Sequence, residues 1–514
     1  MGHHPKQSPS FSTGDGKRFV LFRPSLGRLG RWLCRPSRFL CSLLPVPEMS
    51  APAGSTYREI FASANLRRIY DEHIAKSSAI GIDRINRPTF EKVLRSEIAL
   101  IRRKSANSTY RFSQYREKLV SKGSGRPPRV ISIATFRDRI TLRALCDFLR
   151  ARFQDQLNLQ IPQVVIHRLK EEIATGKYSS FIKLDVRDFY PSIPHALLRA
   201  QVTTRLKSHK AVALLERAIE TPTVSVADKS KAAVAVGVPQ GLAISNLLAE
   251  IFLHPFDTAV ASKVNVAYFR YVDDVFVLTS EPPAPLFEEL RSALESDFGL
   301  SVHPVGTDGS KSTFGLVTNE FTFLGYLFRV GKARVKEQSV QRLERSLADI
   351  FTRYKYRCEE IRRKHHSKAE RRKLLEFAKN SLLWRINLRI TGCIFEKTRK
   401  GWVFYFSQID ESSLEQLRKL DHTVANMLNR FRIRPQTPVR SFVRAYFECH
   451  RKNPTATGYI PNFDTASVVE MRRILERYFG YSVPGMSDAA VKANFAFRIR
   501  RATKELELDI QDIS

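Results

Sequence analysis

Residues Phe269-Arg270-Tyr271-Val272-Asp273-Asp274-Val275-Phe276-Val277-Leu278 place two adjacent carboxylates between two runs of aromatic and β-branched residues. Such runs are typical of strands, so this stretch predicts a β-hairpin with the two acids at its tip. An Asp-Asp turn alone is weak support for chemistry, because acids in turns are most often simply solvated. The interpretation of this hairpin therefore depends on what precedes it in the chain.

Two earlier stretches carry a related pattern. Phe181-Ile-Lys-Leu-Asp185-Val-Arg-Asp188-Phe189-Tyr190 predicts a second strand that ends in an acid, and Gly237-Val-Pro-Gln240-Gly241-Leu-Ala-Ile-Ser245-Asn246 predicts a turn that leads into a helix. In this order, the acid strand, the Pro-Gln-Gly turn and the acid hairpin resemble the palm of reverse transcriptases. The resemblance covers residues 80–335 with high specificity and is much thinner beyond them.

The resemblance implies an α+β fold of the right-hand polymerase type, with fingers, a palm built on an antiparallel sheet, and a helical thumb. A mainly helical C-terminal domain is expected after these parts. The predicted boundaries are residues 49–335 for fingers and palm, 336–385 for the thumb, and 386–514 for an accessory domain with a β-hairpin.

The accessory domain carries no motif that assigns it a role. We expect its hairpin to turn at Lys400-Gly401, with aromatic residues in the second strand. Helices are predicted to follow over residues 414–431, 439–450, 467–479 and 489–506, because apolar residues recur there at helical spacing.

The three acids suit a metal-assisted nucleotidyl transfer. Two Mg²⁺ ions about 3.5–4 Å apart activate the attacking oxygen and neutralise the leaving group, and Mg²⁺ prefers hard oxygen ligands such as carboxylates. We expect Asp185 and Asp273 to bridge two Mg²⁺ ions, with Mn²⁺ as an alternative, and Asp274 to be the third acid. The resemblance makes Lys311 the lysine near the incoming nucleotide that donates a proton to the departing pyrophosphate.

Tyr190 lies five residues after Asp185, where reverse transcriptases carry an aromatic ring that packs under the sugar and collides with a 2′ hydroxyl. Viral RNA-dependent RNA polymerases tend to have an acid at that spacing, and typically Gly-Asp-Asp in the hairpin. The combination of Tyr190 with Tyr271-Val-Asp-Asp therefore predicts an enzyme that makes DNA from deoxynucleotides. An isolated tyrosine at a strand end would equally well be a core residue.

The resemblance also implies contacts to the incoming nucleotide, the primer and the template. The residues expected at the nucleotide are Lys122, Arg126, Arg129, Asp188, Phe189, Tyr190, Gln240 and Gly241. Those expected at the primer or template are Tyr271, Leu324, Gly325, Arg137 and Arg139. Lys122, Arg126 and Arg129 belong to a Gly-rich basic loop whose cations can close over a triphosphate. Asp188 is as readily structural as catalytic.

The charge balance points to a polyanionic partner. Lys and Arg number 85 against 51 Asp and Glu, a net charge of +34, and such an excess most often serves nucleic acid. The helical segment over residues 353–373 is basic on almost every turn, which favours contact with backbone phosphates. The expected partners are an RNA template or a structured noncoding RNA, the DNA product and deoxynucleoside triphosphates, with a homo-oligomer as a further expectation.

Six cysteines lie far apart without any Cys-x-x-Cys pair, which argues against a zinc ribbon or a disulfide framework and indicates reduced thiols in the cytoplasm. No apolar run approaches the ~20 residues that span a bilayer, so no membrane contact is expected.

Residues 1–48 are rich in Pro, Ser, Gly and Arg. They are interpreted as a disordered basic extension or as sequence upstream of a true start at Met49, with a transit peptide as the third interpretation.

The type of reverse transcriptase is narrowed by elimination. Group II intron maturases share the fingers entry segment Gly81-Ile-Asp83, but no DNA-binding or endonuclease tail is recognisable. The Asn-Ala-x-x-His and Val-Thr-Gly signatures of retron enzymes are not found, and diversity-generating enzymes alter the Gln-Gly turn that is intact here. Bacterial defence-associated or abortive-infection enzymes remain, which implies antiphage defence with a noncoding RNA. Untemplated or protein-primed DNA synthesis, primed at a residue such as Tyr478 or Tyr481, and a maturase-like RNA-binding role stay open.

Overall fold

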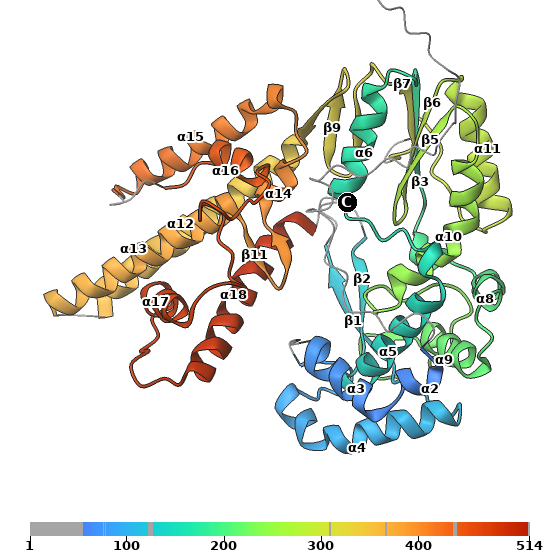
Figure 1. Cartoon of the computed structure of the whole chain (residues 1–514), viewed down its shortest axis with the longest axis horizontal. Helices are drawn as coiled ribbons and strands as arrows, with labels where there is room; N and C mark the ends of the chain where they lie inside the picture. Colours follow the sequence, from blue (N-terminus) through green and yellow to red (C-terminus); the bar gives the residue numbers. More distant parts are fainter. Residues whose placement is uncertain are drawn as a thin grey trace, which may run out of the picture. The chain divides into compact units, whose positions relative to one another are not determined.

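The computed structural model describes residues 55–511, apart from residues 76, 78, 122–126, 308–309, 365–366 and 435–438, and for residues 508–511 it describes only the backbone. The expectations for residues 1–48, and those for Lys122 and Arg126, lie outside the described residues. Figure 1 shows the chain with its elements labelled.

Helices open the described chain. They are α2 (Tyr57–Ile60), α3 (Ser63–Ile69), a π-helical turn (Tyr70–Ile74), α4 (Arg87–Ala106) and α5 (Phe136–Arg152). The start of α4 is specified locally, because the Asn86 side chain accepts a hydrogen bond from Thr89 N at 3.0 Å and Pro88 occupies the first turn.

A four-stranded antiparallel sheet in the order β5-β6-β3-β7 carries the predicted acids. Its strands are β3 (Ser180–Asp185), β5 (Val266–Tyr271), β6 (Asp274–Thr279) and β7 (Thr313–Leu316). The predicted acid strand and acid hairpin are both confirmed, since β3 ends at Asp185 and only Val272 and Asp273 separate β5 from β6.

The two faces of this sheet belong to two hydrophobic cores, because side chains alternate along a strand. Val275 and Val277 lie in the core shared with α10 (Ser245–Ala261). Phe276, from the other face, packs on Phe321 with ring centroids 5.1 Å apart. Phe321 belongs to a second antiparallel sheet made of β8 (Phe321–Phe323), β9 (Tyr326–Arg329) and β10 (Lys332–Val335).

A buried arginine ties the sheet to α10. Arg270 on β5 is 6% exposed, and its guanidinium donates to both carboxylate oxygens of Glu250 at 2.9 Å and pairs with Asp257. Burying these charges is tolerable only because they satisfy one another, so removing the arginine would leave the buried Glu250 and the half-buried Asp257 without a counter-charge. The position of β5 on α10 therefore depends on this network.

The remaining elements before the long C-terminal helices connect these parts. A third sheet has the order β2-β1-β4, with β1 (Tyr115–Val120), β2 (Arg129–Ile133) and β4 (Thr223–Val224). The helices are α6 (Pro162–Ala174), α7 (Phe189–Ser192), α8 (His195–Thr203), α9 (His209–Glu220) and α11 (Pro283–Ser296). The turn predicted over residues 237–246 does lead into a helix, which is α10.

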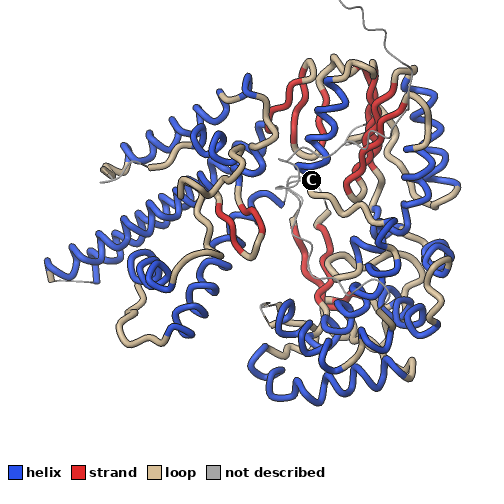
Figure 2. The backbone as a smooth tube through the Cα atoms, viewed as in Figure 1, coloured by secondary structure: helices blue, strands red, loops and turns tan. Residues whose placement is uncertain are grey.

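The chain after β10 is mainly helical, as Figure 2 shows. Its helices are α12 (Glu337–Lys364), α13 (Lys368–Thr391), α14 (Trp402–Phe406), α15 (Glu415–Arg430), α16 (Phe442–Cys449), α17 (Val468–Phe479) and α18 (Asp488–Gln511). The four helices predicted after residue 414 are confirmed within a few residues at each end.

The predicted accessory hairpin exists, but the expected turn is wrong. The strands are β11 (Cys393–Phe395) and β12 (Thr398–Lys400), and they turn at Glu396 and Lys397, both with positive φ. Gly401 has φ 114 and precedes α14, whose five residues are all buried. A short helix buried on every side shows no polar face, so its aromatic run is indistinguishable from a strand in the sequence.

The α+β class is confirmed by the antiparallel sheets and the helical C-terminal part. The domain boundaries at residues 335 and 385 stay predictions. Cys146, Cys358, Cys393 and Cys449 are buried, and none of these four described cysteines takes part in a disulfide. Within the described residues, no helix combines the length and the apolar character that a bilayer crossing requires.

Candidate active site

The structure brings the three predicted acids to one end of the four-stranded sheet. Asp185 is the last residue of β3 and Asp274 is the first of β6, and the two are direct partners in the antiparallel register. Asp273 precedes Asp274 in the turn between β5 and β6. Asp185 and Asp274 are nearly ninety residues apart in the chain, and they lie opposite each other because β3 ends where β6 begins.

The turn that carries Asp273 has a strained backbone and is held by a hydrogen bond from a buried arginine. Val272 has φ 58, a conformation that β-branched residues rarely adopt. The buried guanidinium of Arg270 donates to the Val272 carbonyl oxygen at 2.9 Å. Since Arg270 is itself fixed by Glu250 and Asp257, the ion-pair network under the sheet also holds the backbone that carries the acids.

The electrostatics of the acids favour a cation beside them. Burial, followed by the neighbouring Asp274 and Asp185 carboxylates, raises the pKa of Asp273 to about 6. Burial also raises the pKa of Asp274, although Lys183 and Lys311 oppose the rise. Raised acid pKa values mean that negative charge is costly here, and a divalent cation would relieve that cost.

The end of β3 is held by hydrogen bonds to the backbone N–H and carbonyl oxygen of its last residue. Asp185 N donates to Ser312 Oγ at 3.0 Å, and His303 N donates to the Asp185 carbonyl oxygen at 2.9 Å. His303 Nε2 lies 3.8 Å from Asp185 Oδ2, and Arg187 Nε donates to His303 Nδ1 at 3.2 Å. These contacts hold the Asp185 backbone while its carboxylate remains half-buried at the sheet end.

The donor chemistry suits Mg²⁺ or Mn²⁺, because all three acids offer hard carboxylate oxygens. In the part of the chain that the structure describes, no three Asp, Glu, His or Cys side chains are already grouped tightly enough to count as a metal centre. The match to a divalent ion therefore rests on the residue types and on their convergence at one sheet end. The metal role of these acids stays a prediction.

Tyr190 lies beside the acids. The tyrosine is half-buried, and its hydroxyl donates to Asn246 Oδ1 at 2.7 Å. Burial, and next the Asp273 carboxylate, raise its pKa well above the ordinary value. The neighbouring Phe189 is 2% exposed in the core, which leaves only its backbone for a nucleotide contact. Asp188 is exposed with φ 38 and precedes α7.

The Pro-Gln-Gly turn connects Tyr190 to β2. Val238 N donates to the Tyr190 carbonyl oxygen at 2.8 Å, and Ser132 N of β2 donates to the Gln240 carbonyl oxygen at 2.8 Å. Gly241 has φ 93, and a Cβ there would lie 2.8 Å from Ile131 Cγ2. The third residue of this turn must therefore be glycine on both conformational and steric grounds.

Arg129 opens β2 and is exposed, opposite Val120 in the register of the β1–β2 hairpin. Hydrogen bonds of Ser132 and Val238 join β2, the Gln240-Gly241 turn and Tyr190 into one connected unit. Lys122 and Arg126 follow β1 in the sequence and lie outside the described residues.

Two lysines that the sequence analysis missed lie near the acids together with Lys311. Lys183 is 6% exposed on β3, and burial lowers its pKa while Asp274 opposes that effect. Lys336 follows β10, and burial, then Lys183 and Lys311, lower its pKa to about 8. Lys311 itself is exposed. Lys183 was detectable, since a lysine two residues before Asp185 shares its face of the strand, whereas nothing in the sequence marks Lys336.

The residues expected at the primer or template fall into two groups. Tyr271 is the register partner of Asp274 on β5, and Leu324-Gly325 form the β8–β9 turn with φ 44 and 81. The Gly325 carbonyl oxygen accepts a hydrogen bond from Lys336 N at 3.1 Å, which links this turn to the lysines near the acids. These three residues therefore belong to the site region.

Arg137 and Arg139 form the second group, and no described contact joins them to the acids. Arg139 donates to Ser77 Oγ at 2.8 Å and to the Ala79 carbonyl oxygen at 2.6 Å. Arg137 lies 3.6 Å from a Glu97 carboxylate oxygen. Both guanidinium groups are half-buried and serve contacts between α5 and the N-terminal helices, so their expected primer or template role has no support from their positions.

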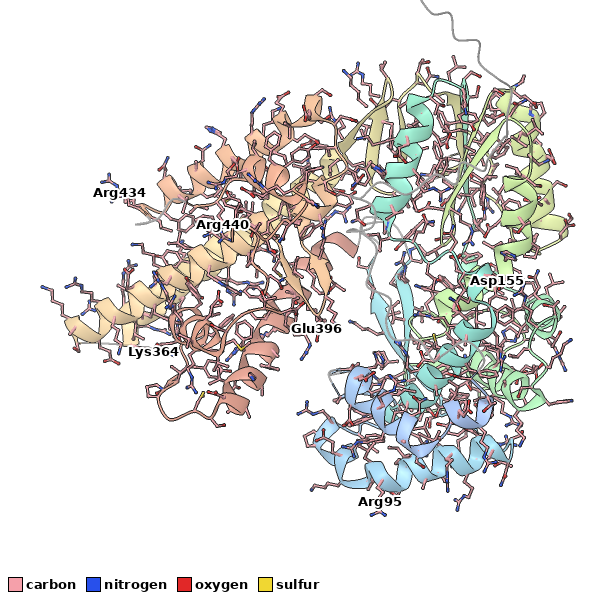
Figure 3. The ribbon with its side chains drawn as sticks, viewed as in Figure 1. Arg95, Asp155, Lys364, Glu396, Arg434 and Arg440 are labelled. Atoms are coloured by element: carbon pink, nitrogen blue, oxygen red, sulfur yellow. The ribbon has the colours of Figure 1, made fainter. Side chains whose placement is uncertain are left out.

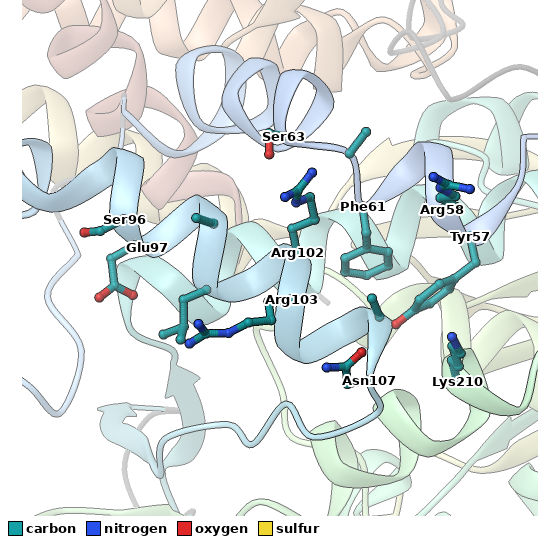
Figure 4. A pocket seen from close by; sticks show the side chains of 14 residues that line it. Tyr57, Arg58, Phe61, Ser63, Ser96, Glu97, Arg102, Arg103, Asn107 and Lys210 are labelled. Carbon is teal, nitrogen blue, oxygen red and sulfur yellow. The ribbon is translucent and has the colours of Figure 1, made fainter.

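A cavity of about 1050 Å³ lies elsewhere, between the α2–α3 segment and α4 (Figure 4). Tyr57, Phe61 and Leu100 contribute apolar surface, and Arg102 and Arg103 line it as well. It contains none of the residues predicted for catalysis.

The central part of the chain is similar in sequence to known proteins. Residues 120–328 match the family model described as reverse transcriptase (RNA-dependent DNA polymerase). Protein YkfC of Escherichia coli (strain K12) is 24% identical over 325 residues, which cover 53% of this chain and 83% of that protein. An uncharacterized 91 kDa protein in a cob intron of Schizosaccharomyces pombe is 27% identical over 154 residues, 29% of this chain and 19% of that protein.

Solved structures of telomerase are distant neighbours. Apo telomerase from Candida tropicalis truncated from its C-terminal domain has a TM-score of 0.35 at 15% identity and covers 44% of this chain and 55% of its own. Telomerase from Candida albicans with the TWJ fragment of telomeric RNA has a TM-score of 0.36 at 10% identity and covers 79% and 69%. At these TM-scores the likeness carries no argument, and the family match rests on the sequence.

Proposed function

Residues 120–328 are a reverse transcriptase domain, the domain of RNA-directed DNA polymerases, and from this premise we propose that the chain copies RNA into DNA at Asp185, Asp273 and Asp274. The observation that carries the proposal is the register pair of Asp185 and Asp274, with Asp273 in the adjoining turn. RNA-directed DNA polymerases are nucleotidyltransferases, and their reaction needs carboxylates that converge from separate strands.

In the proposed mechanism the three carboxylates hold two divalent ions. When bound, these ions lower the pKa of the primer 3′ hydroxyl and neutralise the charge on the triphosphate. Asp185, Asp273 and Asp274 would each supply a carboxylate ligand to these ions. The raised pKa values of Asp273 and Asp274 support the proposal, because carboxylates that repel one another gain most from a shared cation.

We propose that Tyr190 selects the deoxyribose sugar. Its ring is half-buried beside Asp273, and the hydrogen bond to Asn246 holds it in one orientation. A ring fixed in this way cannot retreat from a 2′ hydroxyl, so a ribonucleotide would be rejected sterically. The Gln240-Gly241 turn, joined to Tyr190 through Val238, is the proposed support for the incoming base pair.

Lys311 is the proposed proton donor to the departing pyrophosphate. It is exposed, and it acts electrostatically on both Asp273 and Asp274, so it lies within reach of the same small region. Arg129 is the proposed triphosphate contact, since it is exposed at the start of β2 and its guanidinium has the fork geometry that suits phosphate.

The test is extension of a DNA or RNA primer on an RNA template by purified protein. The double variant Asp273→Asn, Asp274→Asn should lose at least three orders of magnitude in incorporation, because both metal-binding carboxylates become amides. The matched control is Asp297→Asn, Glu320→Gln, which removes two exposed carboxylates elsewhere and should retain activity. Unchanged incorporation by the first variant would refute the assignment.

Untemplated or protein-primed synthesis is the alternative that the family resemblance keeps open. Omitting RNA while supplying single deoxynucleotides separates it from templated copying. Tyr478 and Tyr481 are candidate primers only in the sense that both are tyrosines of the C-terminal part, where both are half-buried. A maturase-like role, in which the chain mainly binds RNA, predicts instead that the acid variants retain full cellular function.

The finer biological role is proposed from the resemblance alone. It is antiphage defence in the bacterial cytoplasm, with a structured noncoding RNA and with assembly into a homo-oligomer. The net charge of +34 supports an RNA partner. Sequencing of nucleic acid that copurifies with the chain identifies the RNA, and phage challenge of cells that carry the acid variant tests the defence role.

A further inference from the structure

A groove outside the reverse transcriptase domain lies between α13 and α17. It consists of two cavities of about 600 and 420 Å³ whose walls share Glu376, Asn380 and Arg477. The larger cavity continues past Trp384 to the segment around Gly458. The wall on α13 extends from residue 369 to residue 388, a helix length of roughly 28 Å at about 1.5 Å per residue.

The groove carries an excess of positive charge. Its cations are Arg372, Lys373, Lys379, Arg440, Arg473 and Arg477, against the carboxylates of Glu376, Glu470 and Glu476. Lys379 lies 3.8 Å from Glu376. The other five cations form no ion pair with any described side chain. Structural ion pairing therefore does not account for them.

One wall of the groove is aromatic and rigid. The rings of Trp384 and Tyr478 stack with centroids 5.9 Å apart and an interplanar angle of 24°. Phe479 meets the edge of Trp384 at 5.0 Å, which fixes the indole from a second direction. Both stacked rings are half-buried, so part of each remains open to the groove. Arg477 lies 5.7 Å from the Tyr478 ring, next to this wall.

Arg440 is oriented without being neutralised. Its backbone N–H donates to Asn387 Oδ1 at 2.9 Å, and its guanidinium donates to the Gly458 carbonyl oxygen at 3.3 Å. The guanidinium also lies over the Tyr459 ring at 5.3 Å. These partners are neutral and fix the side chain, labelled in Figure 3, while its charge stays available. An arginine held in this way suits a phosphate.

We propose that this groove binds a single-stranded segment of RNA, with a base stacked on the Trp384–Tyr478 wall and backbone phosphates on Arg440, Arg473 and Arg477. Stacking platforms combined with cations are the means by which proteins hold single strands without reading sequence. An acidic peptide needs the cations but not the aromatic wall or the amides of Asn380, Asn387 and Asn462 that line the larger cavity. The site is separate from the acids and does not depend on nucleotidyl transfer.

Binding of a fluorescein-labelled 12-nucleotide single-stranded RNA to the full chain tests the proposal by anisotropy across a salt series. Arg473→Ala, Arg477→Ala removes two exposed cations, and the slope of log affinity against log salt should shrink by about 1.4. Tyr478→Leu should lower affinity roughly tenfold with little change in that slope, because it removes stacking and no charge.

The matched control is Arg418→Ala, Arg430→Ala, which removes two exposed arginines from α15 outside the groove. An equal loss of slope in this control would overturn the proposal, since net charge alone would then explain the effect. Unaltered affinity in Tyr478→Leu would also overturn it and would favour an acidic protein as occupant. Extension of a short annealed primer should remain normal in the groove variants, which separates this site from the proposed catalytic one.

Discussion

Asparagine at position 273 should make the metal-free protein more stable. The carboxylate of Asp273 is half-buried and lies near two other acids, and these surroundings raise its pKa from 3.8 to about 6. Above pH 6 the folded protein therefore carries a negative charge that the unfolded chain accommodates more easily. Asp273→Asn removes that charge and keeps the shape of the side chain.

The magnitude and its pH dependence follow from proton linkage. A pKa of about 6 instead of 3.8 corresponds to about 3 kcal/mol, as an upper limit, in the free energy of unfolding. Because the folded state binds the proton more tightly, this destabilisation is absent below about pH 4 and grows as the pH rises towards 6. Above pH 6 it is complete. The stability difference between Asp273→Asn and the native chain should follow the same curve.

The assay is thermal unfolding in EDTA at pH values from 4 to 8, with the native chain, Asp273→Asn and the exposed-site control Asp297→Asn. At pH 8 we expect Asp273→Asn to unfold several degrees above the native chain, and at pH 4 we expect the two to coincide. Adding Mg²⁺ should raise the midpoint of the native chain and have much less effect on the variant, because a bound ion stabilises only the form that holds it.

Two outcomes would refute the reasoning. The first is an Asp273→Asn midpoint at or below that of the native chain at pH 8, which would mean that the carboxylate stabilises the fold without a metal. The second is a gain that does not change between pH 4 and pH 8, which would assign the effect to something other than the charge of this carboxylate.

Tyr190→Ala should admit ribonucleotides, whereas Tyr190→Phe should keep sugar discrimination and lose about 1 kcal/mol of stability with the hydrogen bond to Asn246; single-nucleotide incorporation and urea unfolding measure the two effects. Arg270→Met should cost about 3–5 kcal/mol of unfolding free energy, because the buried Glu250 and the half-buried Asp257 lose their counter-charge. Gly241→Ala should lower the thermal midpoint, since an alanine Cβ would lie 2.8 Å from Ile131 Cγ2 at a φ of 93°.

The sheet that carries the acids was predictable because its signals are local. Runs of aromatic and β-branched residues mark β3 and the β5–β6 hairpin, and an acid at the end of each run implies that the acids converge. The pairing of β7 on the other side of β3, and the parallel contact of β1 with β4, carry no such signal. Those pairings join segments far apart in the chain, and packing decides them.

The cations of the site were harder to predict than its acids, for a physical reason. An acid at the tip of a hairpin stands out against apolar flanks, whereas Lys311 lies in a polar loop segment and Lys336 follows other basic residues, so neither stands out in the sequence. For Arg137 and Arg139, a run of basic residues on α5 predicts contact with nucleic acid, and their guanidinium groups contact the N-terminal segments of this chain. The primer or template role of the two arginines stays a prediction. The sign of a charge is visible in the sequence, but its partner is not.

The lysines explain how this fold tolerates the acids before any metal is bound. Lys183 is buried on the same face of the sheet as Asp185, and both Lys183 and Lys311 favour ionisation of Asp274. Lys336 in turn has its pKa lowered to about 8, chiefly by burial and then by the other two lysines, so the positive side of the cluster is also under strain. The site contains three carboxylates and three ammonium groups. Like charges repel one another within each set, and the equal numbers of opposite charges keep the site near electrical balance. In the proposed function, a divalent ion would compete with these ammonium groups for the three carboxylates.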